Sequence, residues 1–264
     1  GHKHLLNDMK RISEKFNIPS LILTFTPHTN EIIFKKEIKV LTPSDVKFDA
    51  LSKSNIDYLS VINFNDVFSK MDIDVFMNRI IDKYNPLYFF IGYDNKFGFK
   101  RKGSFEYFTN NKIYNHIKFK SSSPFIINKT EVKSSIIKDM IKKGDVINAS
   151  KYLGYQFKIL GKVVKGEGLG RQFGFPTANI DLKYKKQLIP TNGVYSVNLK
   201  LDKKIYLSIC NIGFRPTVSN QSILSIEVHV LNITNIDLYD SLVEIEFIKK
   251  IRNEINFESV NHLQ

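Results

Sequence analysis

Hydrophobic residues in the first 150 positions alternate between helical spacing and short continuous runs. One helix face over residues 4–16 is marked by apolar residues three or four positions apart, namely Leu5, Leu6, Met9, Ile12 and Phe16. Helices are also expected over 43–53 and 72–84. Between the helices lie short apolar runs typical of buried strands, at 20–25, 58–62 and 87–92. This alternation of strand and helix predicts a parallel sheet with helices on both faces.

The pattern changes after Gly154, which ends the second of two short helices expected over 134–142 and 145–153. The following segments are short, alternating and rich in Val, Ile and Tyr, and they cover 157–164, 193–199, 205–211, 223–231 and 242–248. Such segments, separated by turn residues, predict an antiparallel barrel or sandwich. We therefore expect an α/β domain over residues 1–154 and an all-β domain over residues 155–264.

Composition narrows the class of protein. The net charge of +13 allows anionic ligands, but the lysines are scattered without a basic run, as a bias toward Lys, Ile and Asn would produce. The single cysteine, Cys210, excludes an internal disulfide and a cysteine zinc cluster. No run approaches the roughly 18 apolar residues of a membrane helix, and the first residues lack a secretory apolar core. We expect a cytoplasmic protein without a membrane partner.

The segment 166–179 (GEGLGRQFGFPTAN) is the strongest local signal for chemistry. Glycines weaken strand interiors but let backbone N–H groups approach an anion closely, which predicts a phosphate-binding loop formed by Gly166, Gly168, Gly170, Arg171 and Gly174. Thr177 and Asn179 then offer oxygen ligands suited to Mg²⁺ shared with nucleotide phosphates. A flexible hairpin with a proline turn is the alternative interpretation.

Several segments in the second half resemble the riboflavin kinase family. They are 170–180 (GRQFGFPTANI), 189–195 (IPTNGVY), 211–217 (NIGFRPT), 226–229 (IEVH) and 251–254 (IRNE). The resemblance implies a β-barrel kinase that transfers a phosphoryl group from ATP to riboflavin with Mg²⁺. It places Glu227 as the catalytic carboxylate and Thr177 and Asn179 as metal ligands. It also places Asn211 and Arg252 in the flavin site.

Glu227 suits the role of general base, because the ribityl hydroxyl of riboflavin is a weak nucleophile. In the strand expected over 223–231, Ser225, Glu227 and His229 share the polar face. A solvated strand face is the alternative for Glu227. Arg252 would hold a phosphate or the isoalloxazine edge, and an arginine on the surface of a helix is its alternative.

The first half resembles the adenylyltransferase domain of bacterial bifunctional riboflavin kinase/FAD synthetases. The matching segments are Gly1-His2 before the first helix, 24–28 (TFTPH), 91–98 (IGYDNKFG) and 132–138 (VKSSIIK). The resemblance implies a Rossmann-like domain that joins FMN to AMP from ATP. His2 would serve the α-phosphate, whereas Ser134, Ser135 and Lys138 would serve the outer phosphates. Asp94 follows the third strand, at the sheet edge where ligands bind, and would contact the flavin.

Departures from the family pattern leave alternatives open. The sequence begins inside the H-x-G-H motif, so its first histidine is missing and we expect the first domain to be truncated. Lys138 replaces an arginine and lacks its bidentate fork. One alternative is a riboflavin kinase whose first domain is weak or inactive. Another is a basic OB-like protein that binds nucleic acid, but residues 223–231 lack the interleaved aromatic and basic residues this needs. We expect riboflavin, FMN and ATP as partners rather than nucleic acid, and the sequence does not indicate an oligomeric state.

Overall fold

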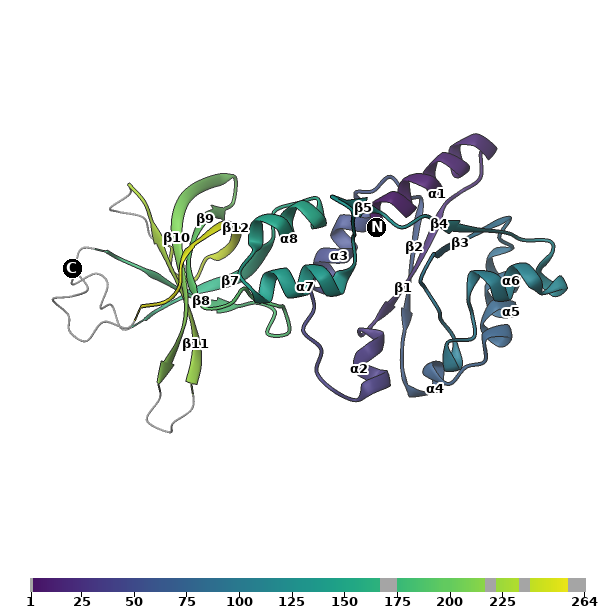
Figure 1. Cartoon of the computed structure of the whole chain (residues 1–264), viewed down its shortest axis with the longest axis horizontal. Coiled ribbons are helices and arrows are strands. Elements are labelled where there is room, and N and C mark those ends of the chain that lie inside the picture. Colours follow the sequence, from purple (N-terminus) through teal and green to yellow (C-terminus); the bar gives the residue numbers. More distant parts are fainter. Residues whose placement is uncertain (1, 167–174, 217–221, 233–237, 256–264) are drawn as a thin grey trace. The chain divides into compact units, whose positions relative to one another are not determined.

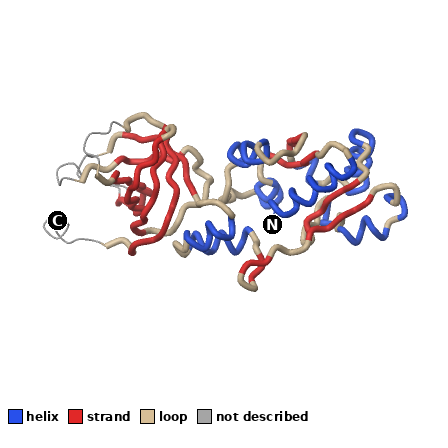
Figure 2. Tube along the Cα trace, turned by 90° about the horizontal axis from the view of Figure 1, so that it is seen from above, coloured by secondary structure: helices blue, strands red, loops and turns tan. Residues whose placement is uncertain are grey.

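The structure is a computed structural model that describes residues 2–166, 175–216, 222–232 and 238–255. Two compact units make up the chain, Gly1–Val132 and Lys133–Gln264, and each is described by itself (Figure 1). Helices and short strands alternate in the first unit, whereas strands gather in the second (Figure 2). None of the helices in the described ranges has the length and apolar character needed to cross a membrane.

The first unit contains the three expected strands, arranged as two parallel pairs, the second of which includes a strand at Lys118–Ser122 that the sequence did not predict. Its helices are α1 (His2–Phe16), α2 (Thr29–Phe34), α3 (Ser44–Ser52), α4 (Asp66–Ser69), α5 (Ile73–Tyr84) and α6 (Phe105–Asn110), with 3₁₀ turns at Phe99–Arg101 and Lys112–Tyr114. Its strands are β1 (Leu21–Thr26), β2 (Tyr58–Asn63), β3 (Tyr88–Gly92), β4 (Lys118–Ser122), β5 (Ile126–Ile127) and β6 (Thr130–Glu131). β1 pairs in parallel with β2, and β3 pairs in parallel with β4. Helices connect the strands of each pair, as parallel pairing requires.

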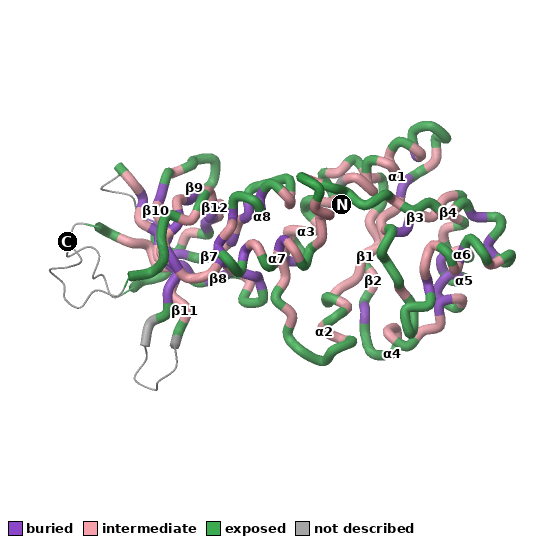
Figure 3. The backbone as a smooth tube through the Cα atoms, in the orientation of Figure 1, coloured by how far each residue is buried: buried purple, intermediate pink, exposed green. Residues whose placement is uncertain are grey.

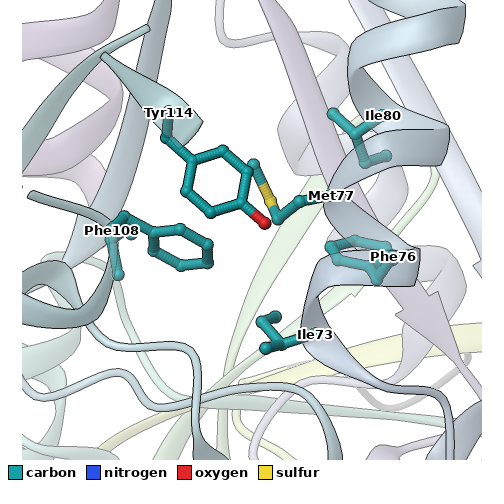
Figure 4. Close-up of a cluster of buried hydrophobic side chains, with 7 residues drawn as sticks. Ile73, Phe76, Met77, Ile80, Phe108 and Tyr114 are labelled. Carbon is teal, nitrogen blue, oxygen red and sulfur yellow. The ribbon is translucent and has the colours of Figure 1, made fainter. Parts of the chain in front are cut away.

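One face of α5 forms the core of the first unit. Its buried side chains follow helical spacing at Ile73, Phe76, Met77 and Ile80, and they lie opposite the rings of Phe108 and Tyr114 (Figure 4). Asp72 caps the helix by accepting a hydrogen bond from the Asp74 N–H group.

Asp74, in the first turn of α5, links this helix through hydrogen bonds to the segment that follows β3. The Tyr107 hydroxyl lies 2.8 Å from one carboxylate oxygen of Asp74, and the Tyr114 hydroxyl donates to the same oxygen at 2.5 Å. Burial and this carboxylate raise the pKa values of both tyrosines. The carboxylate thus satisfies two phenol groups that would otherwise lie unpaired beside the core.

The second unit is a closed antiparallel barrel preceded by two helices. The helices are α7 (Ser134–Lys142) and α8 (Val146–Leu153), and the strands are β7 (Lys158–Val164), β8 (Ala178–Leu182), β9 (Gly193–Leu201), β10 (Lys204–Pro216), β11 (Ser222–Val230) and β12 (Leu242–Arg252). Around the barrel the strands run in the order β10-β11-β8-β7-β12-β9. Closure removes the unpaired edges that an open sheet would expose.

Residues along each barrel strand alternate between the interior and the outer face. On β9, for example, Tyr195, Val197 and Leu199 are fully buried, whereas the residues between them are partly exposed (Figure 3). This confirms the period of two that the sequence predicted. The barrel also confirms the predicted all-β architecture.

The helices α7 and α8 pack within the same unit as the barrel. Gly144 lies between them with φ of 81°, and a Cβ there would meet the Lys250 side chain at 2.8 Å. Gly154 ends α8 in the left-handed conformation, and the Ser150 hydroxyl then accepts the Phe157 N–H at 3.0 Å. The predicted domain boundary at residue 154 stays a prediction.

Candidate active site

A row of paired residues runs around the outside of the barrel. From β12 to β7 the row consists of Arg252, Val194, Asn211, Glu227, Asn179 and Val164. Directly paired residues project to the same side of a sheet. The neighbours of Glu227 along β11, Ile226 and Val228, are buried, so Glu227 and its partners face outward. The register therefore places the polar side chains of Asn211, Glu227 and Asn179 on three adjacent strands.

Two hydroxyl groups engage the Glu227 carboxylate. Thr177, just before β8, donates a hydrogen bond of 3.1 Å to Oε2. Ser225, two residues earlier on β11, donates one of 3.1 Å to Oε1. The two hydrogen bonds hold the carboxylate at the barrel surface. Thr177 and Glu227 are only partly buried, so the carboxylate is still accessible to solvent. A carboxylate that accepts two hydroxyl donors is held in one orientation rather than free to rotate.

Gly166 lies against the amide of Asn179. A Cβ built on Gly166 would lie 1.9 Å from Asn179 Nδ2 and 2.6 Å from its Cγ. Only glycine allows this approach without displacing the Asn179 side chain. Gly166 and Asn179 are thus in direct contact. Gly168, Gly170, Arg171 and Gly174 lie outside the described residues.

The predicted flavin residues of the second unit occupy different parts of the row. Asn211 pairs with Glu227, whereas Arg252 is separated from Asn211 by Val194. Arg252 belongs to strand β12, so the alternative of an arginine on a helix is wrong, because β12 continues beyond the predicted end at residue 248. Its Nη1 donates to the Asn253 carbonyl at 3.1 Å.

Two further residues near the row were not predicted as site residues. The Glu254 carboxylate covers Gly213, where an added Cβ would lie 2.0 Å from Glu254 Oε1. His229 Nδ1 lies 2.8 Å from the Pro176 carbonyl oxygen, and its ring packs edge-on against Phe175 at 5.7 Å between centroids. For His229 the sequence did hold a signal, since it shares the polar face of its strand with Glu227.

The donors gathered here suit a magnesium-bound phosphate ligand. A hydroxyl, an amide and a carboxylate are hard oxygen ligands, and Mg²⁺ is usually held by one or two carboxylates together with substrate phosphates. In the described part of the chain no three His, Cys, Asp or Glu residues gather as a metal site of their own.

In the first unit, the predicted residues lie at strand and helix ends. Asp94 is exposed just after β3, in a turn where the Asn95 N–H donates to the Gly92 carbonyl at 2.9 Å. His2 begins α1, but its side chain lies outside what the structure describes. Lys47 on α3, not predicted from sequence, donates to the Thr24 hydroxyl on β1 at 3.1 Å, and burial lowers its pKa. Thr24 belongs to the TFTPH segment, which places Lys47 beside one of the family-like motifs.

The residues predicted for the outer phosphates begin α7, which lies in the second unit. Ser134 and Ser135 are exposed in its first turn. Lys138 is partly buried on the next turn, and burial, assisted by the charge of Lys142, lowers its pKa. Lys133 precedes the helix, and its side chain, which has no acceptor, makes no capping hydrogen bond with the first N–H groups of α7.

Comparison with known proteins covers both units. A family model described as riboflavin kinase matches residues 153–264, and one described as FAD synthetase matches residues 1–136. A bifunctional riboflavin kinase/FMN adenylyltransferase of Buchnera aphidicola subsp. Schizaphis graminum is 35% identical over all of this chain and 85% of its own length. Another of that name from Haemophilus influenzae is 32% identical, with the same coverage.

A solved structure from Streptococcus pneumoniae, described as a macrolide-efflux protein, shares the fold. It matches 99% of this chain and 85% of its own with a TM-score of 0.89 and 24% identity. This likeness supports the arrangement of an α/β unit followed by a barrel.

Proposed function

The chain belongs to the family of bifunctional riboflavin kinase/FMN adenylyltransferases, and from this we propose that it makes FMN and FAD. The barrel phosphorylates riboflavin with ATP. The α/β unit transfers AMP from ATP to FMN, which yields FAD and pyrophosphate. Both reactions consume ATP, so ATP is a substrate of each unit.

The contact between Thr177 and Glu227 carries the kinase proposal, because it joins a nucleotide-loop residue to the strand of the proposed base. Glu227 accepts the proton of the terminal ribityl hydroxyl as this oxygen attacks the γ-phosphorus of ATP. A bond forms from that oxygen to phosphorus, the bond to the bridging oxygen of ADP breaks, and ADP leaves. Thr177 and Ser225 hold the two carboxylate oxygens in place until the substrate hydroxyl arrives.

Thr177 and Asn179 are the residues that we propose to hold Mg²⁺ on the ATP phosphates. The hydroxyl and amide beside a single carboxylate fit this ion, as described above. When bound, it would offset the negative charge that builds up during phosphoryl transfer. We propose that the ATP phosphates are bound by the loop residues Gly166, Gly168, Gly170, Arg171 and Gly174. We propose that the flavin is bound by Asn211 and Arg252.

The α/β unit needs cations and donors rather than a base, because the FMN phosphate is already an anionic nucleophile. Its oxygen attacks the α-phosphorus of ATP, and pyrophosphate leaves. We propose His2 at the α-phosphate and Asp94 at the flavin. Within the proposed adenylyltransferase domain of residues 1–154, we propose Ser134, Ser135 and Lys138, at the start of α7, for the departing phosphates. Because both reactions consume cellular ATP, we propose that the protein is located in the cytoplasm.

The test is to incubate this chain with riboflavin and Mg-ATP and to separate riboflavin, FMN and FAD by chromatography. The proposal expects FMN first and FAD after it, and no product when a chelator removes Mg²⁺. FMN without FAD would support a kinase with an inactive first unit. Unchanged riboflavin would overturn the kinase assignment.

A further inference from the structure

The pairing between β8 and β11 ends just where the proposed catalytic groups lie. The two strands pair through Asn179 with Glu227 and through Ala178 with Val228. The residues that follow this pairing are Thr177, just before β8, and His229 on β11. Pro176 comes next and has no N–H group, so it cannot donate to a sheet ladder. The segment that carries Thr177 therefore needs another attachment to β11.

His229 supplies that attachment through its side chain. Its Nδ1 lies 2.8 Å from the Pro176 carbonyl oxygen. A carbonyl oxygen only accepts hydrogen bonds, so Nδ1 carries the hydrogen and donates it. The same imidazole meets the edge of the Phe175 ring at 5.7 Å between centroids, with 71° between the planes. One side chain thus contacts two consecutive residues just before Thr177.

Two links consequently join the same two segments. Glu227 and His229 are two positions apart on the outer face of β11, and Thr177 and Pro176 are neighbours. Glu227 accepts from the Thr177 hydroxyl, and His229 donates to the Pro176 carbonyl. The second link restricts the backbone from which the Thr177 hydroxyl projects. Without it, the 3.1 Å distance to Glu227 would depend on the Thr177 side chain and on the two strand pairs at Ala178 and Asn179, with nothing to fix the backbone before Thr177.

We infer that His229 is a positioning residue of the kinase site, which fixes Thr177 relative to Glu227 by holding the Pro176 carbonyl. This inference rests on the proposed kinase function. His229 acts through Pro176 and Thr177 and touches no reacting atom in this account. Its loss should weaken productive Mg-ATP binding, because Thr177 is a proposed ligand, and leave the adenylyltransferase unit unaffected.

The matched test compares His229→Asn with His229→Leu. The asparagine Nδ2 is bonded to Cγ, as the imidazole Nδ1 is, so it can donate to the same carbonyl. Leucine has nearly the shape of asparagine but no donor. Kinetics of riboflavin phosphorylation give KM for Mg-ATP and kcat. FAD formation from supplied FMN by the same chains is the internal control, and thermal unfolding reports on the fold.

We expect His229→Leu to lower kcat/KM for Mg-ATP about tenfold, the effect of one lost hydrogen bond, and His229→Asn to restore most of it. FAD formation from FMN should match wild type in both variants. Equal kinetics for Leu and Asn, or wild-type kinetics for Leu, would overturn the inference while leaving the kinase intact. If His229→Leu does not fold, His229→Ala takes its place as the variant without a donor. Equal losses of kcat/KM in folded His229→Asn and His229→Ala would then overturn the inference. A wild-type chain that makes no FMN would overturn the kinase proposal and the positioning role with it.

Discussion

The hydroxyl of Thr177 donates to the carboxylate of Glu227 across 50 positions of sequence. Thr177 lies just before β8 and Glu227 lies on β11, so the contact depends on closure of the barrel rather than on local sequence. It brings a proposed metal ligand and the proposed base to one point on the outer face.

Replacing Thr177 by valine keeps the side-chain shape and removes the donor. We expect kcat/KM for Mg-ATP in riboflavin phosphorylation to fall roughly tenfold to a hundredfold, because a hydrogen bond to a charged group and a metal ligand are both lost. Steady-state kinetics at several Mg²⁺ concentrations measure this, and more Mg²⁺ should be needed for half-maximal rate.

Ser225→Ala is the control for the Thr177→Val variant. It removes the other donor to Glu227 but no proposed metal ligand, so the rate should fall less and its Mg²⁺ dependence should stay that of wild type. Equal Mg²⁺ dependence in the two variants would contradict the role of Thr177 as a ligand.

Gly166→Ala tests whether the Asn179 amide must lie where it does. A Cβ at this position would lie 1.9 Å from Asn179 Nδ2, so the amide must move. Because Gly166 is exposed, we expect kinase activity to fall by at least about tenfold with little change in unfolding temperature. Flavin chromatography and thermal unfolding measure the two effects.

Gly161→Ala should affect mainly stability rather than kinase activity. Gly161 is buried, and a Cβ there would lie 2.3 Å from Ile180 Cγ2 and 2.8 Å from the Asp181 carbonyl oxygen. We expect a loss of stability of roughly 1–3 kcal/mol, as for overpacked interiors. The opposite result, in which Gly166→Ala lowers the unfolding temperature and Gly161→Ala leaves it unchanged, would contradict the different roles of these two glycines.

The stability of the first unit should fall at alkaline pH through Tyr114. Burial and the Asp74 carboxylate raise the pKa of Tyr114 above its unfolded value of about 10. The folded state therefore keeps a proton that the unfolded state loses. The protonated Tyr114 therefore contributes its full share to the free energy of unfolding below about pH 10. This share is lost as the pH rises further, by up to about 1.4 kcal/mol per pH unit.

Tyr114→Phe should reduce this pH-dependent loss, leaving the part that comes from Tyr107, whose pKa is also raised, and should lower stability at neutral pH, since the hydrogen bond to Asp74 disappears. Urea unfolding followed by circular dichroism between pH 8 and 11 measures both effects. Tyr58→Phe, at an exposed tyrosine, is the matched control. An identical slope above pH 10 in Tyr114→Phe and wild type would contradict the argument.

The sequence predicted the elements well because periodicity is local. The face of α5 at Ile73, Phe76, Met77 and Ile80 repeats at helical spacing, and β9 repeats at spacing of two. Both patterns follow from the geometry of a single helix or strand and need no knowledge of partners. The structure confirms the α/β unit and the antiparallel barrel that these patterns indicated.

Register across the barrel could not be predicted in the same way. Whether Glu227 pairs with Asn179 or with a residue next to it depends on how six strands close, and a shift by one residue would turn Glu227 inward. The family resemblance named Thr177, Asn179 and Glu227, but only the register shows that they share a face. His229 and Lys47 were not predicted as site residues. The polar face of its strand was a signal for His229, but its partner, the Pro176 carbonyl, and the partner of Lys47, a distant hydroxyl, could not be found from sequence.

Glu227→Gln shows whether the Glu227 carboxylate acts as the general base of riboflavin phosphorylation. Glutamine keeps the size of the side chain but cannot accept a proton, and general bases contribute about 10²- to 10⁴-fold to rate. The measurement is the initial rate of FMN formation from riboflavin and saturating Mg-ATP, with FAD formation from supplied FMN and the unfolding temperature recorded on the same samples. The account predicts a loss of at least about a hundredfold in FMN formation, with FAD formation and unfolding temperature unchanged. FMN formation within a few fold of wild type would contradict it, because the proton would then leave by another route.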